Sequence, residues 1–177
     1  MKILALLLLF LSSCGYHCGT GALAARYNTI SIPYVQGDNE GAMTQALIQK
    51  VSTQSMLHYA NNDGDLLLKV CLSDPKEKNI GYRYAPNSTT VVVASEGRLT
   101  QEATVTVVDC ENSCTVLGPF KIVATFDYDF LSDMSNINEH AFSLGQLEMN
   151  SLAKVAATPA LYNLLAEKIT DYVNNSW

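Results

Sequence analysis

FKIVATFDYDF, residues 120–130, alternates along its whole length between apolar or aromatic side chains and a second set that is mostly polar. Because successive side chains of a strand point to opposite faces, this period of two predicts a β-strand with one buried and one wet face. The positions expected to be buried are Phe120, Ile122, Ala124, Phe126, Tyr128 and Phe130. This stretch therefore predicts a sheet that is covered on one side only.

The same reasoning predicts three more strands and two helices. Strands are expected at residues 29–35, 66–73 and 98–109, and helices from about residue 40 to 58 and from residue 142 onward. Two helices on one face of the sheet would bury the apolar sides economically. The predicted fold class is α+β, a two-layer sandwich of an about four-stranded, mostly antiparallel sheet with two helices packed on one face.

Turn and capping residues set several boundaries. Pro33 lacks an amide donor, so it places the first strand at an edge or ends it. Asn39 is expected to cap the first helix. Residues 80–97 stay ambiguous between a loop and an extended segment, and Pro159 either kinks the last helix or starts a second one. The apolar stripe of that helix includes Leu152, Val155, Leu161, Leu165, Ile169 and Val173.

The composition is that of one folded domain. The chain has 177 residues, of which 48% are hydrophobic, and its 11 Lys and Arg against 17 Asp and Glu give a net charge of −6. These values exclude a disordered chain, a collagen-like repeat and a short disulfide scaffold. The net acidity also argues against nucleic acid as a partner, since phosphates require a basic surface.

The N-terminus is typical of an exported chain. Lys2 precedes the nine-residue apolar run 3–11, which is far shorter than the ~20 residues that cross a bilayer. Leu-Ser-Ser-Cys, ending at Cys14, resembles a bacterial lipobox. We therefore expect a signal peptide at residues 1–13, a lipidated linker at 14–28 and a single α+β domain at 29–177. An ordinary signal peptide with a chance cysteine, or a buried N-terminal helix, is the alternative.

The remaining cysteines are an even set in an exported chain. They are Cys18, Cys71, Cys110 and Cys114, and they allow three pairings. Cys110 and Cys114 flank Glu-Asn-Ser between two expected strands, so a hairpin would bring them within disulfide range. A zinc site built from His17, Cys18 and this pair is the alternative, but the spacing matches no strong zinc pattern. The sequence predicts a disulfide or buried thiols, with no metal and no cofactor.

No constellation indicates catalysis. The three histidines, His17, His58 and His140, belong to no known catalytic motif, and His58 is expected at the end of the first helix. Asp127 and Asp129 lie on the wet face of their strand and lack the further ligands and glycine of a calcium loop. The chain is therefore not expected to be an enzyme.

Cys-Gly-Tyr-His, residues 14–17, directly after the apolar run, resembles the mature N-terminus of the LptE family. The strand Ile-Ser-Ile-Pro-Tyr, residues 30–34, and the order of elements after it are also similar to that family. The resemblance implies a non-enzymatic lipoprotein, anchored in the outer membrane on its periplasmic side. It implies that the protein plugs a large LptD-like β-barrel, supports barrel assembly and serves lipopolysaccharide transport to the outer leaflet.

Two other functions remain open from the residues alone. One is a free-standing periplasmic lipoprotein that binds lipid or envelope polymer, and the other is a small envelope enzyme. Lipopolysaccharide is anionic, so an acidic domain could contact it only through a local basic site. The candidates are Arg83, Arg98 and Lys121, although ordinary surface charges are the preferred interpretation.

Cys14 provides the first prediction. Replacing Cys14 with Ala should yield a non-lipidated protein, because the thiol that receives the acyl group is lost. Mass spectrometry of the native and variant proteins measures this. A native protein that retains an unmodified Met1 would contradict the predicted anchor.

Overall fold

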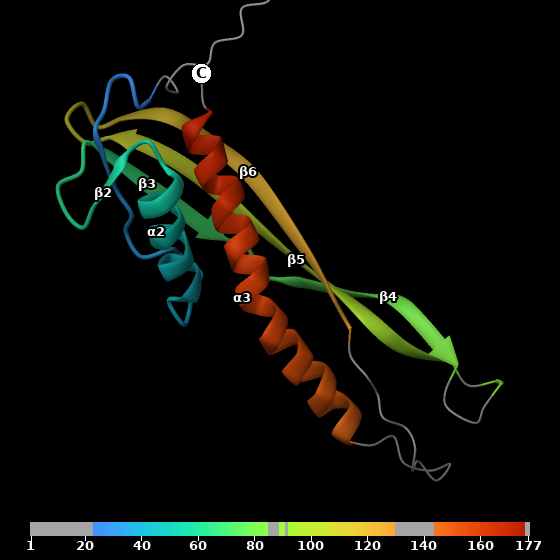
Figure 1. The fold of residues 1–177 in the computed structure, drawn as a ribbon. Coiled ribbons are helices and arrows are strands. Elements are labelled where there is room, and N and C mark those ends of the chain that lie inside the picture. The colour runs from blue at the N-terminus through green and yellow to red at the C-terminus, as the bar shows by residue number, and fades with distance from the viewer. Residues whose placement is uncertain (1–22, 85–88, 91, 130–143, 176–177) are drawn as a thin grey trace, which may run out of the picture.

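The computed structural model describes residues 23–84, 89–90, 92–129 and 144–175, with side chains from residue 151 onward in the last range. Two helices cover one face of a curled sheet (Figure 1). The elements in chain order are β1 (Thr29–Ser31), α2 (Ala42–Gln54), β2 (His58–Ala60), β3 (Leu66–Leu72), β4 (Lys76–Tyr84), β5 (Val92–Asp109), β6 (Cys114–Asp129) and α3 (Leu144–Asn174). The α+β class and the two helices are as predicted, but the sheet has six strands rather than about four.

Strand β5 organises the sheet. β3 and β4 follow one another along one edge of β5, and β6 pairs with its other edge; all three pairings are antiparallel. β1 pairs in parallel with both β3 and β2. The sheet is therefore antiparallel around β5 and parallel at the end that holds the short strands.

The alternation predicts the buried faces well wherever helices cover the sheet. Leu66, Leu68, Val70 and Leu72 of β3 and Ala103, Val105 and Val107 of β5 are buried as expected. In β6, Ile122, Ala124 and Tyr128 are buried and Phe126 packs half-buried against them. Phe120 is half exposed and instead stacks on Tyr172 of α3, with ring centroids 4.8 Å apart. Phe130 lies outside the described residues.

The ambiguous segment at residues 80–97 contains a strand that the pattern did not reveal. β4 has no buried residue, and the register shifts between Asn79 and Gly81 and again between Gly81 and Tyr82. Each shift interrupts the period of two, and an uncovered strand needs no apolar face. The pattern in this segment therefore gave no clear period, and β5 begins six residues before the predicted start at Arg98.

The predictions for both ends of the first helix are wrong. Gly41, at φ 78°, is the N-cap residue of α2 and makes no side-chain cap. The buried carboxylate of Asp38 does the capping instead of Asn39, accepting hydrogen bonds from the Thr44 amide and hydroxyl, both at 2.7 Å. At the other end, α2 stops at Gln54, and His58 belongs to β2, where its amide donates to the Asn28 carbonyl.

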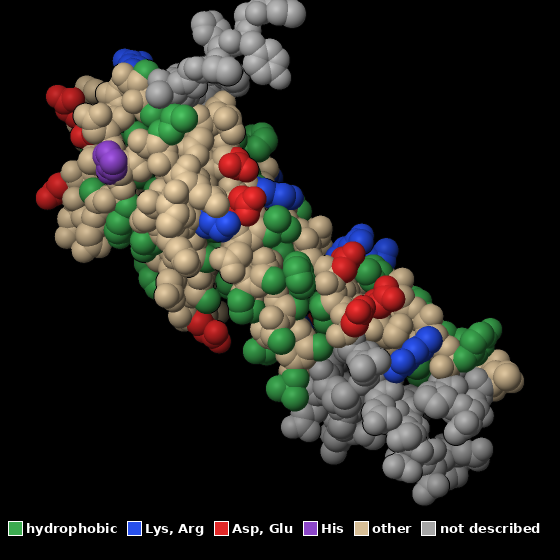
Figure 2. Space-filling model, in the orientation of Figure 1, with side chains coloured by type: hydrophobic (Ala, Val, Ile, Leu, Met, Phe, Trp, Pro, Cys, Tyr) green, Lys and Arg blue, Asp and Glu red, His purple; other side chains and the backbone are tan. Residues whose placement is uncertain are grey.

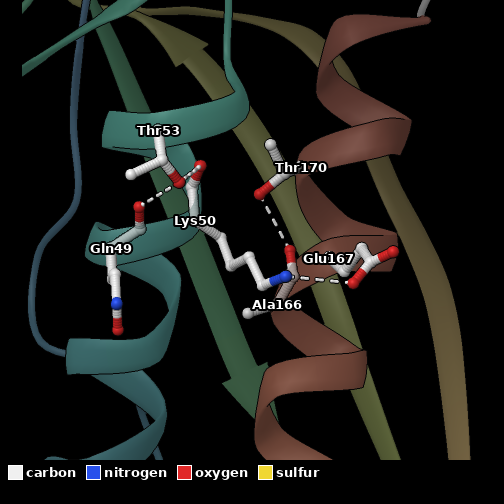
Figure 3. A network of polar contacts seen from close by, with 6 residues as sticks. All are labelled: Gln49, Lys50, Thr53, Ala166, Glu167 and Thr170. Atoms are coloured by element: carbon white, nitrogen blue, oxygen red, sulfur yellow. Dashed lines mark hydrogen bonds and ion pairs between the residues drawn. The ribbon is translucent and has the colours of Figure 1, made fainter.

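α2 and the second half of α3 lie side by side. Lys50 of α2 forms an ion pair with Glu167 of α3 at 3.0 Å (Figure 3). The hydroxyls of Thr53 and Thr170 donate hydrogen bonds to carbonyls of their own helices. Asn174 closes the end of α2, because its amide nitrogen donates to the Gln54 carbonyl and its oxygen accepts from the Ser55 hydroxyl. Polar contacts thus join the two helices both along their length and at the end of α2.

α3 is one continuous helix through Pro159, so no second helix starts there. Leu161, Leu165, Ile169 and Val173 are buried as predicted, but Leu152 and Val155 are 64% and 66% exposed. Leu152 lies about five turns before the buried Thr170, and Val155 lies about five turns before the buried Val173. Each exposed residue is therefore on the same side of the helix as its buried counterpart. Leu152 and Val155 are exposed because α2 runs beside only the second half of α3 (Figure 1).

The cap of α2 provides a matched pair of variants. Asp38→Ala should lower the free energy of unfolding by about 1 kcal/mol, because the Thr44 amide loses its acceptor. Asn39→Ala, one residue away, should change it little. Denaturant unfolding of both variants measures the difference. A larger loss for Asn39→Ala would show that the cap is assigned to the wrong residue.

Candidate functional site

The uncovered face of the sheet is lined with charged and hydroxyl side chains. Arg98 of β5 lies directly opposite Asp127 of β6 and donates two hydrogen bonds to its carboxylate, at 2.6 and 2.8 Å. This two-bond ion pair raises the pKa of Arg98 and lowers the pKa of Asp127, mainly through the hydrogen bonds. The arginine charge is therefore matched by an acid on the next strand.

Lys121 of β6 is matched in the same way. Its ammonium lies 2.7 Å from the carboxylate of Glu102 on β5, diagonally across the strand pair. The hydrogen bond and charge of Lys121 lower the pKa of Glu102, and Lys76 of β4 adds to that effect. Both pairs are solvent-exposed, so they contribute little to stability. Their main effect is to make this face polar while balancing its charge locally.

The three basic residues singled out in the sequence are not brought together. Arg98 and the Thr104 that faces Lys121 are six residues apart on β5, which is about 20 Å along the strand. Arg83 lies farther out on β4, half-buried and opposite Val93. The three therefore do not line one pocket.

Sequence reasoning missed two lysines on this face. Lys78 lies directly opposite Arg98, and Lys76 lies opposite Thr100, so two further cations lie beside the Arg98–Asp127 and Lys121–Glu102 pairs. The alternation Lys-Glu-Lys at residues 76–78 was the available signal, but β4 was not assigned as a strand.

On the covered face, three elements meet at one carboxylate. The Tyr128 hydroxyl donates to Glu77 of β4 at 2.6 Å, and the Lys154 ammonium of α3 donates to the other carboxylate oxygen at 2.9 Å. Burial, followed by the hydrogen bond to Glu77, raises the pKa of Tyr128. Gly97 lies beneath the ring, since a Cβ there would sit 2.6 Å from the ring carbon that bears the hydroxyl. This cluster ties α3 to the sheet.

The turn between β5 and β6 differs from the expected three-residue loop. The last strand pair is Asp109 with Cys114, so Cys110 begins a four-residue turn rather than facing Cys114. Asp109 accepts hydrogen bonds from Asn112, Glu111 and Tyr27, and chiefly those from Asn112 lower its pKa. Cys110 and Cys114 are exposed free thiols in the structure, as is Cys71. The disulfide stays a prediction.

The described residues contain no group of three or more His, Cys, Asp or Glu side chains that could hold a metal ion. The lipidation candidate Cys14, together with His17, Cys18 and His140, lies outside the described residues. His58 is exposed at the sheet edge in β2. Over the same described ranges, no helix has both the length and the apolarity to span a membrane.

A model of the LptE family, described as lipopolysaccharide-assembly, matches residues 27–176. No curated protein matches the chain. The crystal structure of a minor lipoprotein from Acinetobacter baumannii is similar, with 14% identity over 84% of this chain and 91% of that one and a TM-score of 0.52. At this identity the likeness concerns the fold alone.

A second solved structure is the rare lipoprotein B from Shewanella oneidensis. It shares 15% identity over 82% of this chain and 93% of that chain, with a TM-score of 0.47. A likeness at that score carries no argument about this protein.

The hairpin thiols can be tested directly. We expect Cys110 and Cys114 to be linked in protein isolated from the envelope, because an oxidising compartment favours pairing of two exposed thiols that flank one turn. Peptide mapping without reductant measures the linkage, and mapping after reduction is the control. Recovery of both thiols unmodified from the envelope would exclude the disulfide.

Proposed function

From the premise that the chain belongs to the LptE lipopolysaccharide-assembly family, we propose that it is the partner and plug of a large outer-membrane β-barrel. This family is a non-enzymatic lipoprotein family. In the proposed role the domain fills the barrel, supports barrel assembly and thereby serves lipopolysaccharide transport to the outer leaflet. The observation that carries the proposal is the family match across residues 27–176, which spans nearly the whole described fold.

The two faces of the sheet support this role physically. The helices bury one face, so the domain is closed on that side without a partner. The other face presents threonines and locally paired charges, including Arg98 with Asp127 and Lys121 with Glu102. The lumen of a large outer-membrane barrel is polar. A surface on which Arg98 and Lys121 are already paired with carboxylates leaves fewer ions unmatched when it lies in such a lumen.

The anchor completes the proposal. Acylation of Cys14 after removal of residues 1–13 would hold the protein at the outer membrane, with residues 14–28 as the linker. Eight residues separate Cys14 from Leu23, the first described residue, and they span at most about 30 Å. The domain would therefore stay close to the periplasmic surface of that membrane, where a barrel partner opens.

Direct contact with lipopolysaccharide is proposed to be weak and sensitive to salt. The candidate contacts remain Arg83, Arg98 and Lys121. Arg98 and Lys121 already form ion pairs with carboxylates, and the chain as a whole is acidic. Long-range repulsion would oppose an anionic glycolipid, and salt would screen any local attraction. The domain acts mainly through its barrel partner.

Two substitutions separate these roles. Arg98→Glu should leave the amount of assembled barrel nearly unchanged, because it alters one exposed pair. Phe126→Ser should unfold the domain and deplete the barrel, since Phe126 packs against the core and large-to-small core changes cost about 3–5 kcal/mol. Barrel levels in cells that produce each variant measure the difference.

The opposite pattern would contradict the proposal. If the isolated domain bound lipopolysaccharide tightly at physiological salt and Arg98→Glu abolished that binding, the domain would act as a lipopolysaccharide receptor rather than through its partner. If Phe126→Ser unfolded the domain while barrel levels stayed normal, the assembly role would be wrong.

A further inference from the structure

The hairpin formed by β4 and the start of β5 projects from the rest of the fold. We call its outer part, residues 82–84 and 92–94, the arm; none of these residues is buried. Figure 1 shows that the arm leaves the region covered by α2 and α3. The arm is thus a two-stranded ribbon without a covering layer, which is an arrangement of marginal stability in water.

One face of the arm is apolar and aromatic. Tyr82 lies opposite Ala94, and Tyr84 lies opposite Val92, so all four side chains share one face of the ribbon. Tyr82, Tyr84 and Val92 are 63%, 64% and 55% exposed. Large apolar side chains gathered at the end of a projection are typical of a docking surface.

The charge of this segment differs from that of the whole chain. No acidic residue occurs between Glu77 and Glu96, whereas Lys78 and Arg83 lie in that interval. The chain as a whole carries 17 acidic against 11 basic residues. In Figure 2 the far end of the arm is green and tan, with no red side chain. An anionic surface would therefore repel most of this protein but not the arm.

The chemistry of tyrosine favours a lipid surface over a dry protein groove. A tyrosine ring is apolar at its body and polar at its hydroxyl, and such rings concentrate at the boundary between headgroups and acyl chains. Another exposed apolar pair, Leu152 and Val155 on α3, has no such polar tip. Arg83, which lies between the two tyrosines in the strand, adds attraction to anionic headgroups.

We propose that the end of the arm docks into the headgroup boundary of an anionic phospholipid bilayer when the protein is not seated in a barrel. This inference goes beyond the barrel partnership and does not depend on it. The described chain begins near Asp109, to which Tyr27 donates a hydrogen bond, at the other end of β5 from the arm (Figure 1). β5 spans about 60 Å, so the lipid anchor and the arm would attach the two ends of the molecule.

A tryptophan reporter in the full-length lipidated protein tests the docking. Trp177 is the one tryptophan of the chain, so Trp177→Phe provides a silent background. Tyr84→Trp then reports from the arm, and Leu152→Trp is the matched control at an equally exposed site on α3. Each protein is reconstituted, without a barrel, in phosphatidylglycerol-containing vesicles with brominated acyl chains.

Emission of the Tyr84→Trp reporter should fall about twofold or more, because a docked side chain lies 5–10 Å into the boundary, within reach of bromine. Emission of the Leu152→Trp reporter should stay unchanged. Adding Tyr82→Ser, using phosphatidylcholine alone or raising the salt should each weaken the quenching. No quenching at position 84, equal quenching at both positions, or a response only to added lipopolysaccharide would overturn the inference. Failure of the barrel partnership would leave this measurement unaffected.

Discussion

The structure depends on β5 being held on three sides. Between Leu99 and Asp109 this strand has hydrogen-bonded neighbours on both edges and helices over one face. Every second side chain in that stretch is buried, and two of them, Gln101 and Asp109, are polar. Gln101 is 1% exposed and donates to the Ser73 carbonyl at 2.6 Å, where β3 gives way to β4. A single buried amide thus holds the junction of the two strands that share one edge of β5.

How far the sequence predicts this fold follows from how each segment is covered. The faces of β3, β5 and β6 were predictable, because a sheet covered on one side must alternate there. β4 was missed, since its strand is uncovered and its period is broken around Gly81. Leu152 and Val155 fit the apolar periodicity of the last helix, but they are exposed because α2 does not extend alongside them. Periodicity reports which side of an element can be buried, not how far its neighbours extend.

The candidate surface shows the same limit. The alternation places Arg98, Lys121 and Asp127 on the wet face, as the structure has them. It cannot pair Arg98 with Asp127, or Lys121 with Glu102, because strand register is set by the turn and by the bulges between β5 and β6. The capping of α2 by Asp38 rather than Asn39 is a similar case, because the sequence pattern does not show which of two neighbouring polar side chains reaches the Thr44 amide.

These features combine into a protein whose sheet is covered by helices on one face and is polar on the other. Its family membership concerns lipopolysaccharide assembly, and on its charged face Arg98 and Lys121 are paired with carboxylates of neighbouring strands. Such a domain is suited to occupy and order a polar cavity in another protein. The barrel partnership is therefore the central claim.

Affinity purification of the lipidated full-length protein from its native envelope tests that claim most directly. The account predicts a stable one-to-one complex with a large outer-membrane β-barrel. Recovery of an isolated monomer, which binds lipid or envelope polymer equally well without any barrel, would contradict it.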